Sequence, residues 1–262
     1  MCDDVGMRRF GFVYNPTNDL AQEAWDEAAG WCAANGVACW GHAAEEVAAV
    51  RSALPGTEVL ISFGGDGTFL RAASAVAGTA TPLLGVNLGK VGFLARAEAF
   101  QIEPTLDALH AKRWTTQPRM ALRATIHHGA GRTEQLAALN DVVVARGRLP
   151  RVLRLDVAVG ESHLATYIAD GVIVSSPTGS TGYSFSAGGP ILEPTSRNLI
   201  VTPIAAYLAN AALSDRLPNP NGDLHDCAGR GRGGLHRWVD RSAADDWRSS
   251  FRYRGEAANQ LR

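Results

Sequence analysis

The sequence has few features that would place the protein at a membrane, a metal ion or a nucleic acid. Its four cysteines show neither metal-ligand spacing nor a disulfide framework, so we expect reduced thiols: Cys2, Cys32, Cys39 and Cys227. No apolar run approaches the ~20 residues that a membrane-spanning helix needs. The formal net charge of −1 gives no basic footprint for nucleic acid.

The first residues, MCDDVGMRRFGFVYNP, are acidic at once and lack the apolar core of a signal peptide. We therefore expect a cytoplasmic protein. Hydrophobic residues make up 46% of the 262 and charged residues 19%, so the chain can build a core. This length suits one large domain or two modest ones.

Residues 1–114 alternate between strand and helix patterns, which predicts an α/β domain with parallel neighbouring strands. Asp19 is the expected N-cap of the first helix, and Gly36 is its expected stop. The expected strands are 9–14, 37–40, 58–63 and 82–86, and the expected helices are 19–35, 43–53, 68–76 and 103–112.

Residues 115–210 show little helical periodicity and predict a second, β-rich domain. Its expected strands are 120–127, 139–145, 152–159 and 163–168, with a further strand, 172–174, before a glycine-rich loop. From Ala211 onward there is one Val and no Ile, while Arg and Gly are frequent. No strand pattern fits residues 211–262, which we interpret as a divergent tail, either disordered or read in a shifted frame.

A carboxylate lies among glycines where the buried strand 58–63 ends, in Gly64-Gly65-Asp66-Gly67-Thr68. Glycine lets a ligand approach the backbone, and the helix expected to open at Thr68 would attract phosphate. A carboxylate there makes sense if it handles a proton, holds a hydroxyl or faces Mg²⁺. The alternative is a tight turn in which Asp66 caps the helix locally.

Two better-known phosphate motifs are absent. The stretch Gly85 to Val91 (GVNLGKV) has three residues between its glycines where a Walker A loop has four, and Val91 replaces the hydroxyl residue. No GxGxxG follows the first strand.

A denser cluster, DGVIVSSPTGSTGYSFSAGGP, spans residues 170–190. Its hydroxyls and exposed N–H groups suit ribose and phosphate oxygens, and Tyr183 suits a base; a polar surface loop is the alternative. Upstream, Asn140-Asp141 interrupts a strand pattern and is either a bulge or a ligand contact. His127-His128 opens HHGAGRTEQ, which we expect to be a solvated turn.

Together, GGDGTFLRAA, PLLGVNLGKVGFLA, LNDVVV and DGVIVSSPTGSTGYSFSAGGP resemble, in order and spacing, the motifs of the NAD kinase family over residues 8–210. The resemblance implies an α/β domain and a β-sandwich-like domain with the site between them. It implies transfer of the ATP γ-phosphoryl group, or one from polyphosphate, to the 2′-hydroxyl of the adenosine ribose of NAD, giving NADP, with Mg²⁺ accompanying ATP. It also implies a homo-oligomer, a dimer or tetramer, if the tail permits.

By the same resemblance, Asp66 accepts the proton of that hydroxyl and Gly67 lies beside it at the nucleotide. Phe93 packs near the adenine, and Asn140 and Asp141 hold polar groups of ribose or base. The remaining expected nucleotide contacts are Arg151, Asp170, Thr178, Thr181, Gly182, Tyr183, Ser184 and Ser186.

This chain departs from the family pattern at several positions. Asp141 stands where the family usually has Glu, Gly182 where Ala is usual, and Ile168 where many members are polar. The closing strands that the family adds after NLIVTPIAAYLAN have no counterpart we can identify in the tail.

Two other functions remain open from the residues. Lipid kinases and phosphofructokinases share related glycine-aspartate turns, although the 170–190 loop and the lack of an apolar surface-binding segment disfavour a lipid kinase. A nucleotide-binding or regulatory protein that lost turnover with its tail is the second alternative.

Overall fold

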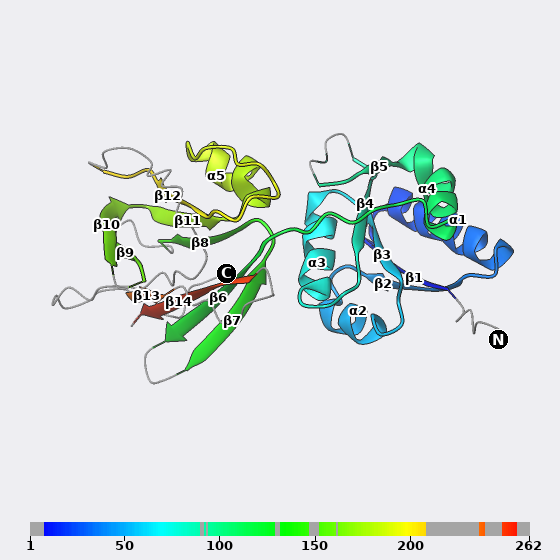
Figure 1. Ribbon diagram of the computed structural model, residues 1–262, viewed down its shortest axis with the longest axis horizontal. Helices are drawn as coiled ribbons and strands as arrows, with labels where there is room; N and C mark the ends of the chain where they lie inside the picture. Colours follow the sequence, from blue (N-terminus) through cyan, green and yellow to red (C-terminus); the bar gives the residue numbers. More distant parts are fainter. Residues whose placement is uncertain are drawn as a thin grey trace. The chain divides into compact units, whose positions relative to one another are not determined.

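The computed structural model describes residues 8–89, 92, 94–128, 132–146, 152–160 and 162–207, together with the backbone of 236–238 and 248–255. The chain divides into two compact units, Met1–Thr116 (unit 1) and Gln117–Arg262 (unit 2). Figure 1 shows helices gathered around the sheet of unit 1 and strands dominating unit 2.

Unit 1 is built on a five-stranded parallel sheet in the order β2-β1-β3-β4-β5. The central strand β3 is buried along Val59–Phe63, as its uninterrupted apolar sequence predicts. The strands are β1 (Arg9–Tyr14), β2 (Ala38–Ala43), β3 (Val59–Gly64), β4 (Leu83–Asn87) and β5 (Ala97–Glu98).

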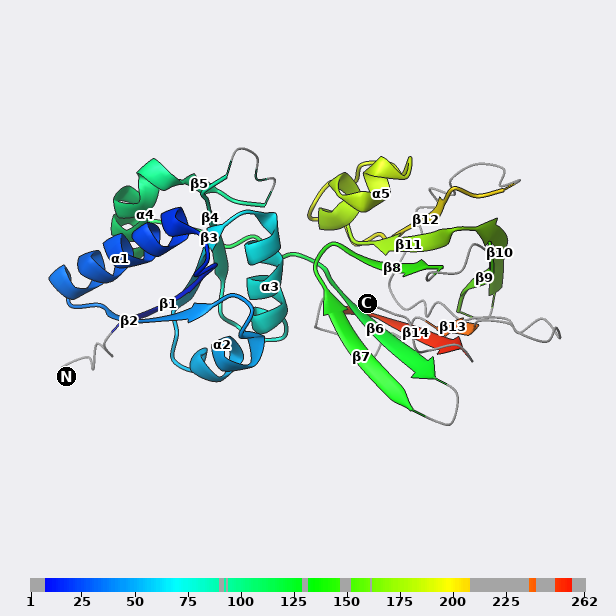
Figure 2. The same cartoon turned by 180° about the vertical axis from the view of Figure 1, so that it is seen from behind.

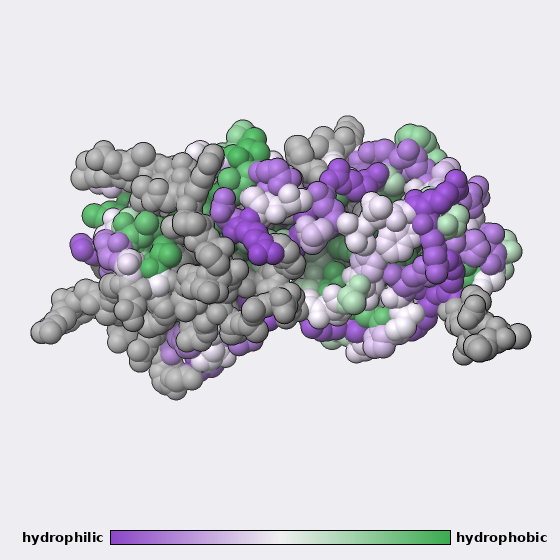
Figure 3. All heavy atoms as spheres, in the orientation of Figure 1, coloured by the Kyte–Doolittle hydropathy of each residue, from purple (hydrophilic) through white to green (hydrophobic). Residues whose placement is uncertain are grey.

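Helices cover both faces of this sheet (Figures 1 and 2). Alternate strand residues face opposite sides, so Phe12 and Ile61 pack under α1 and α4, whereas Val13 and Leu60 pack under α2 and α3. The helices are α1 (Asp19–Ala34), α2 (Val47–Ala53), α3 (Asp66–Val76) and α4 (Ile102–His110), with a short 3₁₀ turn, η1 (Ala99–Gln101), before α4. In Figure 3, the outer surface over α1 and α4 is largely hydrophilic.

Three helix boundaries correct the sequence predictions. Asn18, not Asp19, caps α1, because its side chain accepts the backbone N–H of Leu20 at 3.0 Å. Helix α2 begins at Val47 because β2 continues to Ala43 along its pairing with β1. Helix α3 begins at Asp66, two residues before Thr68, so the carboxylate lies inside its first turn.

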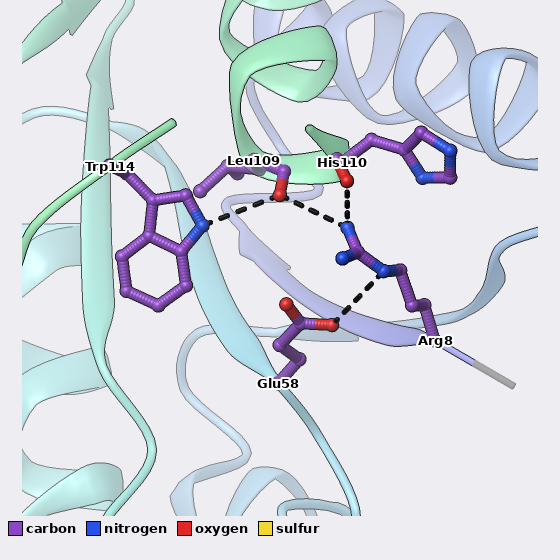
Figure 4. Close-up of polar contacts among 5 residues, drawn as sticks. All are labelled: Arg8, Glu58, Leu109, His110 and Trp114. Atoms are coloured by element: carbon purple, nitrogen blue, oxygen red, sulfur yellow. Dashed lines mark hydrogen bonds and ion pairs between the residues drawn. The ribbon is translucent and has the colours of Figure 1, made fainter. Parts of the chain in front are cut away.

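The C-terminal end of α4 is fixed by Arg8 (Figure 4). Its guanidinium donates to the carbonyl oxygens of Leu109, at 3.2 Å, and of His110, and its Nε lies 3.8 Å from Glu58. The indole N–H of Trp114 donates to the same Leu109 oxygen at 3.3 Å. The guanidinium cation and the indole N–H thus satisfy carbonyls that have no partner within the helix.

Unit 2 consists almost entirely of antiparallel strands around one apolar core. One sheet has the order β12-β11-β8, a second has β13-β14-β6-β7, and β9 and β10 form a hairpin. The strands are β6 (Ala121–His128), β7 (Thr133–Ala138), β8 (Asp141–Ala145), β9 (Leu153–Val159), β10 (Ser162–Ala169), β11 (Gly171–Ser175), β12 (Ile200–Ile204), β13 (His236–Trp238) and β14 (Arg248–Gly255). The prediction of an α/β domain followed by a β-rich domain is confirmed.

Two segments of unit 2 differ from the sequence predictions. The expected solvated turn over HHGAGRTEQ is wrong at both ends, because His127 and His128 end β6 and Thr133 begins β7. His128 is 6% exposed, with its Nε2 3.2 Å from Glu134, and residues 129–131 lie outside the described residues. The tail, where no strand pattern was found, contributes β13 and β14, and β14 pairs in parallel with all of β6.

Within the described residues, no helix has the length and apolar character required to cross a membrane.

Candidate functional site

The turn after β3 places the carboxylate of Asp66 by close packing. Gly64 has a φ of +153°, and a Cβ there would lie 2.5 Å from the hydroxyl oxygen of buried Thr68. Gly65 occupies the N-cap position of α3, but it has no side chain that could accept a hydrogen bond from the first turn of the helix. The oxygen Oδ1 of Asp66 instead accepts the backbone N–H of Leu94 at 3.2 Å. Asp66 is therefore not the N-cap, and a distant loop fixes the direction of its carboxylate.

Asn87 organises the loop that follows β4 and was missed from the sequence. Its amide nitrogen donates to the carbonyl of Gly89 and to Glu98, both at 3.1 Å, and its Oδ1 accepts the N–H of Gly89 at 3.1 Å. A Cβ at Gly92 would stand 3.0 Å from that Oδ1. A polar residue closing an apolar strand before glycine was the available signal. Phe93, expected near the adenine, lies outside the described residues.

In unit 2, residues 176–192, which we call the nucleotide loop, pack against Asn140. The backbone N–H of Ser176 donates to the Asn140 carbonyl at 2.8 Å, and a Cβ at Gly179 would overlap the same carbonyl. A Cβ at Gly182 would lie 3.7 Å from both Nδ2 of Asn140 and Oδ2 of Asp141. Residues from two separate motifs, Asn140-Asp141 and Gly182, therefore lie together.

This cluster contains polar atoms that the fold itself leaves unsatisfied. Burial raises the pKa of the Asp141 carboxyl above its ordinary value. Among the residues that the structure describes, Oδ1 of Asn140 and Oγ1 of Thr178 are buried without a hydrogen-bond partner. Because a buried unsatisfied polar atom costs about 1–3 kcal/mol, such a group is well suited to a polar ligand.

The other predicted residues of the loop divide by exposure. Thr181, Tyr183 and Ser186 are exposed, Tyr183 by 47%, and are accessible to a ligand. Ser184 is fully buried, and its hydroxyl lies 2.9 Å from that of Thr202. The loop contains the 3₁₀ turn η3 (Thr178–Thr181) and the short helix α5 (Tyr183–Ser186).

Asp170 is held by a residue that the sequence did not single out. Its carboxylate lies 2.9 Å from Nε of Arg146 and accepts from Nη2 at 3.4 Å. The backbone N–H of Arg146 also donates to the Asp170 carbonyl at 2.9 Å, so the pair is fixed at the ends of β8 and β10. Arg151, the cation expected at the site, lies outside the described residues. No group of three or more His, Cys, Asp or Glu side chains suited to a metal ion occurs in the described part of the chain.

Comparison with known proteins places these motifs in one family. The ATP-NAD kinase N-terminal domain matches residues 8–114, and the ATP-NAD kinase C-terminal domain matches residues 139–213. An NAD kinase of Dehalococcoides mccartyi is 36% identical over 202 residues, which are 77% of this chain and 71% of that protein. An NAD kinase of Moorella thermoacetica is 49% identical over 150 residues, 57% of this chain, and the chain spans about half (48%) of its length.

A solved structure supports the fold. Yeast NADH kinase, crystallised in complex with NADH, superposes with a TM-score of 0.72 at 22% identity, covering 96% of this chain and 84% of that one. The two matched domains follow the same order as units 1 and 2, and together they contain the glycine-aspartate turn and the nucleotide loop. The chain belongs to the NAD kinase family.

Proposed function

We propose that this chain is an NAD kinase that transfers the γ-phosphoryl group of ATP to the 2′-hydroxyl of the adenosine ribose of NAD, giving NADP. The observation that supports it best is the cluster of Asn140, Asp141 and Gly182, which contains a partly buried carboxyl and the unsatisfied Oδ1 of Asn140. The unsatisfied Oγ1 of Thr178 precedes Gly179, the residue that packs on the Asn140 carbonyl. Family membership supplies the reaction for which such a site is suited.

In this proposal, unit 2 holds the dinucleotide. Oδ1 of Asn140 and the carboxylate of Asp141 accept hydrogen bonds from ribose hydroxyls or an exocyclic amine, and the Thr178 hydroxyl bonds a ligand oxygen. Gly182 leaves the neighbouring backbone open to the ligand, and the half-exposed ring of Tyr183 is available for stacking on a base.

Three further residues complete the proposed contacts. Thr181 and Ser186 add exposed hydroxyls. Asp170 contacts the ligand either while it remains paired with Arg146 or after it exchanges Arg146 for the ligand.

Asp66 acts on the acceptor hydroxyl. Phosphoryl transfer passes through a loose transition state, so positioning and neutralisation of charge contribute more than a strong base. The N–H of Leu94 directs the carboxylate of Asp66, which orients the 2′-hydroxyl and accepts its proton late in the reaction. Gly67, exposed beside it in the first turn of α3, leaves the backbone N–H groups of the helix end open to phosphate.

Mg²⁺ enters this proposal with ATP. Magnesium is commonly held by one or two carboxylates together with substrate phosphates, so a site without a three-ligand cluster among the described residues fits a metal carried by the nucleotide. When bound, it would neutralise phosphate charge. Polyphosphate as donor, a homo-oligomer, a cytoplasmic location and the lack of nucleic-acid or membrane partners stay predictions from the sequence.

A coupled assay for NADP tests the proposal directly. Purified chain, NAD, MgCl₂ and ATP are expected to give NADP, measured with an NADP-specific dehydrogenase. Parallel reactions omit NAD or replace it by a diacylglycerol or a sphingoid base, which a lipid kinase would phosphorylate. Phosphorylation of a lipid without NADP formation would overturn the proposal.

A second candidate is a protein that binds NAD without turning it over. It is favoured by the C-terminal family model ending at residue 213 and by the chain spanning 48% of the Moorella relative. Calorimetric binding of NAD to a sample that forms no NADP would support it, whereas binding with turnover would exclude it.

A further inference from the structure

We propose that the buried hydroxyl pair of Ser184 and Thr202 is a positioning device that sets the nucleotide loop for NAD, although neither hydroxyl is open to a ligand. This inference rests on the proposed function for its kinetic consequence. Ser184 was expected to be a ligand contact, and its burial argues for a different role. Both residues are fully buried, and their hydroxyl oxygens lie 2.9 Å apart.

The pair joins the short helix α5 to the strand β12. Thr202 lies at the centre of β12, opposite Ile173 of β11, and both strands belong to the core sheet of unit 2. Ser184 belongs to α5, which has only four residues and cannot be stable as an isolated helix. The hydroxyl pair therefore ties a marginal helix to a rigid strand.

Gly189 makes this bond possible. A Cβ at Gly189 would overlap the hydroxyl oxygen of Ser184 and would lie 2.7 Å from that of Thr202. The backbone N–H of Gly189 also donates to the Ser184 carbonyl at 2.8 Å, which closes the end of the helix over the pair. Close packing thus explains Gly189, the second glycine of the GGP sequence.

The bond determines where the proposed ligand contacts lie. Ser184 is flanked by Tyr183 and Phe185, both exposed, so one turn of helix points one hydroxyl inward and the neighbouring side chains outward. Rotation of α5 would move Tyr183, Gly182 and Ser186 together. Loss of the pair should therefore weaken NAD binding without changing chemistry at Asp66.

The test uses the full chain and a double-mutant cycle: Ser184→Ala, Thr202→Val and the double variant. Thr125→Val serves as a matched control, because Thr125 is likewise buried in a strand of unit 2. We expect each single variant to raise the KM for NAD about tenfold and to change kcat by less than about twofold. A tenfold change is the size expected when one buried hydrogen bond is lost and its remaining partner is left unsatisfied. The double variant should have no larger effect than either single variant, because the second substitution removes a hydroxyl that has already lost its partner.

Hydrogen exchange gives a readout that does not need turnover. Peptides spanning 180–190 should exchange about tenfold faster in each single variant, while β11 keeps its protection and Thr125→Val matches the wild type. Gly189→Ala, which wedges the pair apart, should reproduce both effects.

Unchanged exchange and unchanged KM in both single variants would overturn the proposal. Equal loss of protection throughout β11 and β12 would overturn it too, since the pair would then stabilise the fold generally. If the wild type forms no NADP, the proposed function fails, yet the exchange result still decides whether the pair positions the loop.

Discussion

Leu94 donates its backbone N–H to Oδ1 of Asp66 at 3.2 Å, across 28 residues of sequence. The bond joins the loop after β4 to the first turn of α3, and Asn87 in turn shapes that loop through Gly89 and Glu98. The direction of the carboxylate therefore depends on a second strand end as well as on its own turn.

Replacing Asp66 by Asn should keep the fold and lower turnover. The amide oxygen still accepts from Leu94, but it cannot take the proton of the acceptor hydroxyl. We expect the rate of NADP formation to fall at least ~100-fold, the low end for loss of general acid–base catalysis, with the thermal melting curve preserved. Asp26→Asn, at an exposed position of α1, is the matched control. Turnover near the wild-type rate would remove Asp66 from the mechanism.

Asp141 should make stability depend on pH in a defined direction. Burial raises its pKa above 3.8, so its contribution is fully favourable below the unfolded value and is lost as pH rises through the folded pKa. Asp141→Asn resembles the protonated form at every pH. The Tm of this variant should exceed that of the wild type at pH 7, and the difference should vanish as pH falls below about 3.8.

Thermal unfolding between pH 3 and pH 8 measures this difference, with Asp26→Asn as a surface control that should show none of it. A Tm difference of the opposite sign at pH 7 would contradict the assigned burial cost.

Arg8→Ala should loosen the end of α4 and destabilise unit 1. It removes the charged donor from the carbonyls of Leu109 and His110 and leaves Glu58 without that partner. We expect a loss of about 1–3 kcal/mol in the free energy of unfolding by urea, the range for charged hydrogen bonds. Arg8→Lys should recover only part, because an ammonium group lacks the fork of donors. A full recovery by lysine would show that charge alone suffices.

Replacing two glycines of one turn by alanine should change the free energy of unfolding in opposite directions. Gly64→Ala drives a Cβ to 2.5 Å from the Thr68 hydroxyl oxygen and should cost about 1–3 kcal/mol of folding stability through overpacking. Gly67→Ala meets nothing within 4 Å inside α3 and should stabilise the helix by about 0.5–1 kcal/mol. Urea unfolding measures the free energy of unfolding of both variants. Equal changes in the two variants would mean that the packing around Thr68 is looser than described.

Sequence patterns predicted β1 and β3 of unit 1 well because the middle residues of these strands are buried on both faces, whereas the two-residue strand β5 was missed. β3 lies within one residue of its expected range, as the uninterrupted run from Val59 to Phe63 allows. β7 was missed because it is exposed at five of its six positions and shows no alternation of apolar and polar residues. β14 was missed because RSSFRYRG contains no aliphatic residue, and its partner strand β6 lies far earlier in the chain.

The site residues likewise divide into those that local sequence marks and those whose roles depend on long-range contacts. Glycine-rich turns marked Asp66 and Gly182, and a polar pair interrupting a strand pattern marked Asn140 and Asp141. The inward direction of Ser184 and the pairing of Asp170 with Arg146 depend on contacts with β12 and β8, which sequence spacing does not reveal.

The pairing of β14 with β6 has a consequence for folding during synthesis of the chain on the ribosome. Ala121, at the start of β6, leaves the ribosome more than a hundred residues before Arg248, its partner in β14. One edge of β6 therefore lacks its β14 partner until that later segment has been made, and incomplete nascent chains are prone to wrong association. A premature stop codon upstream of residue 248 would leave that edge of β6 permanently open.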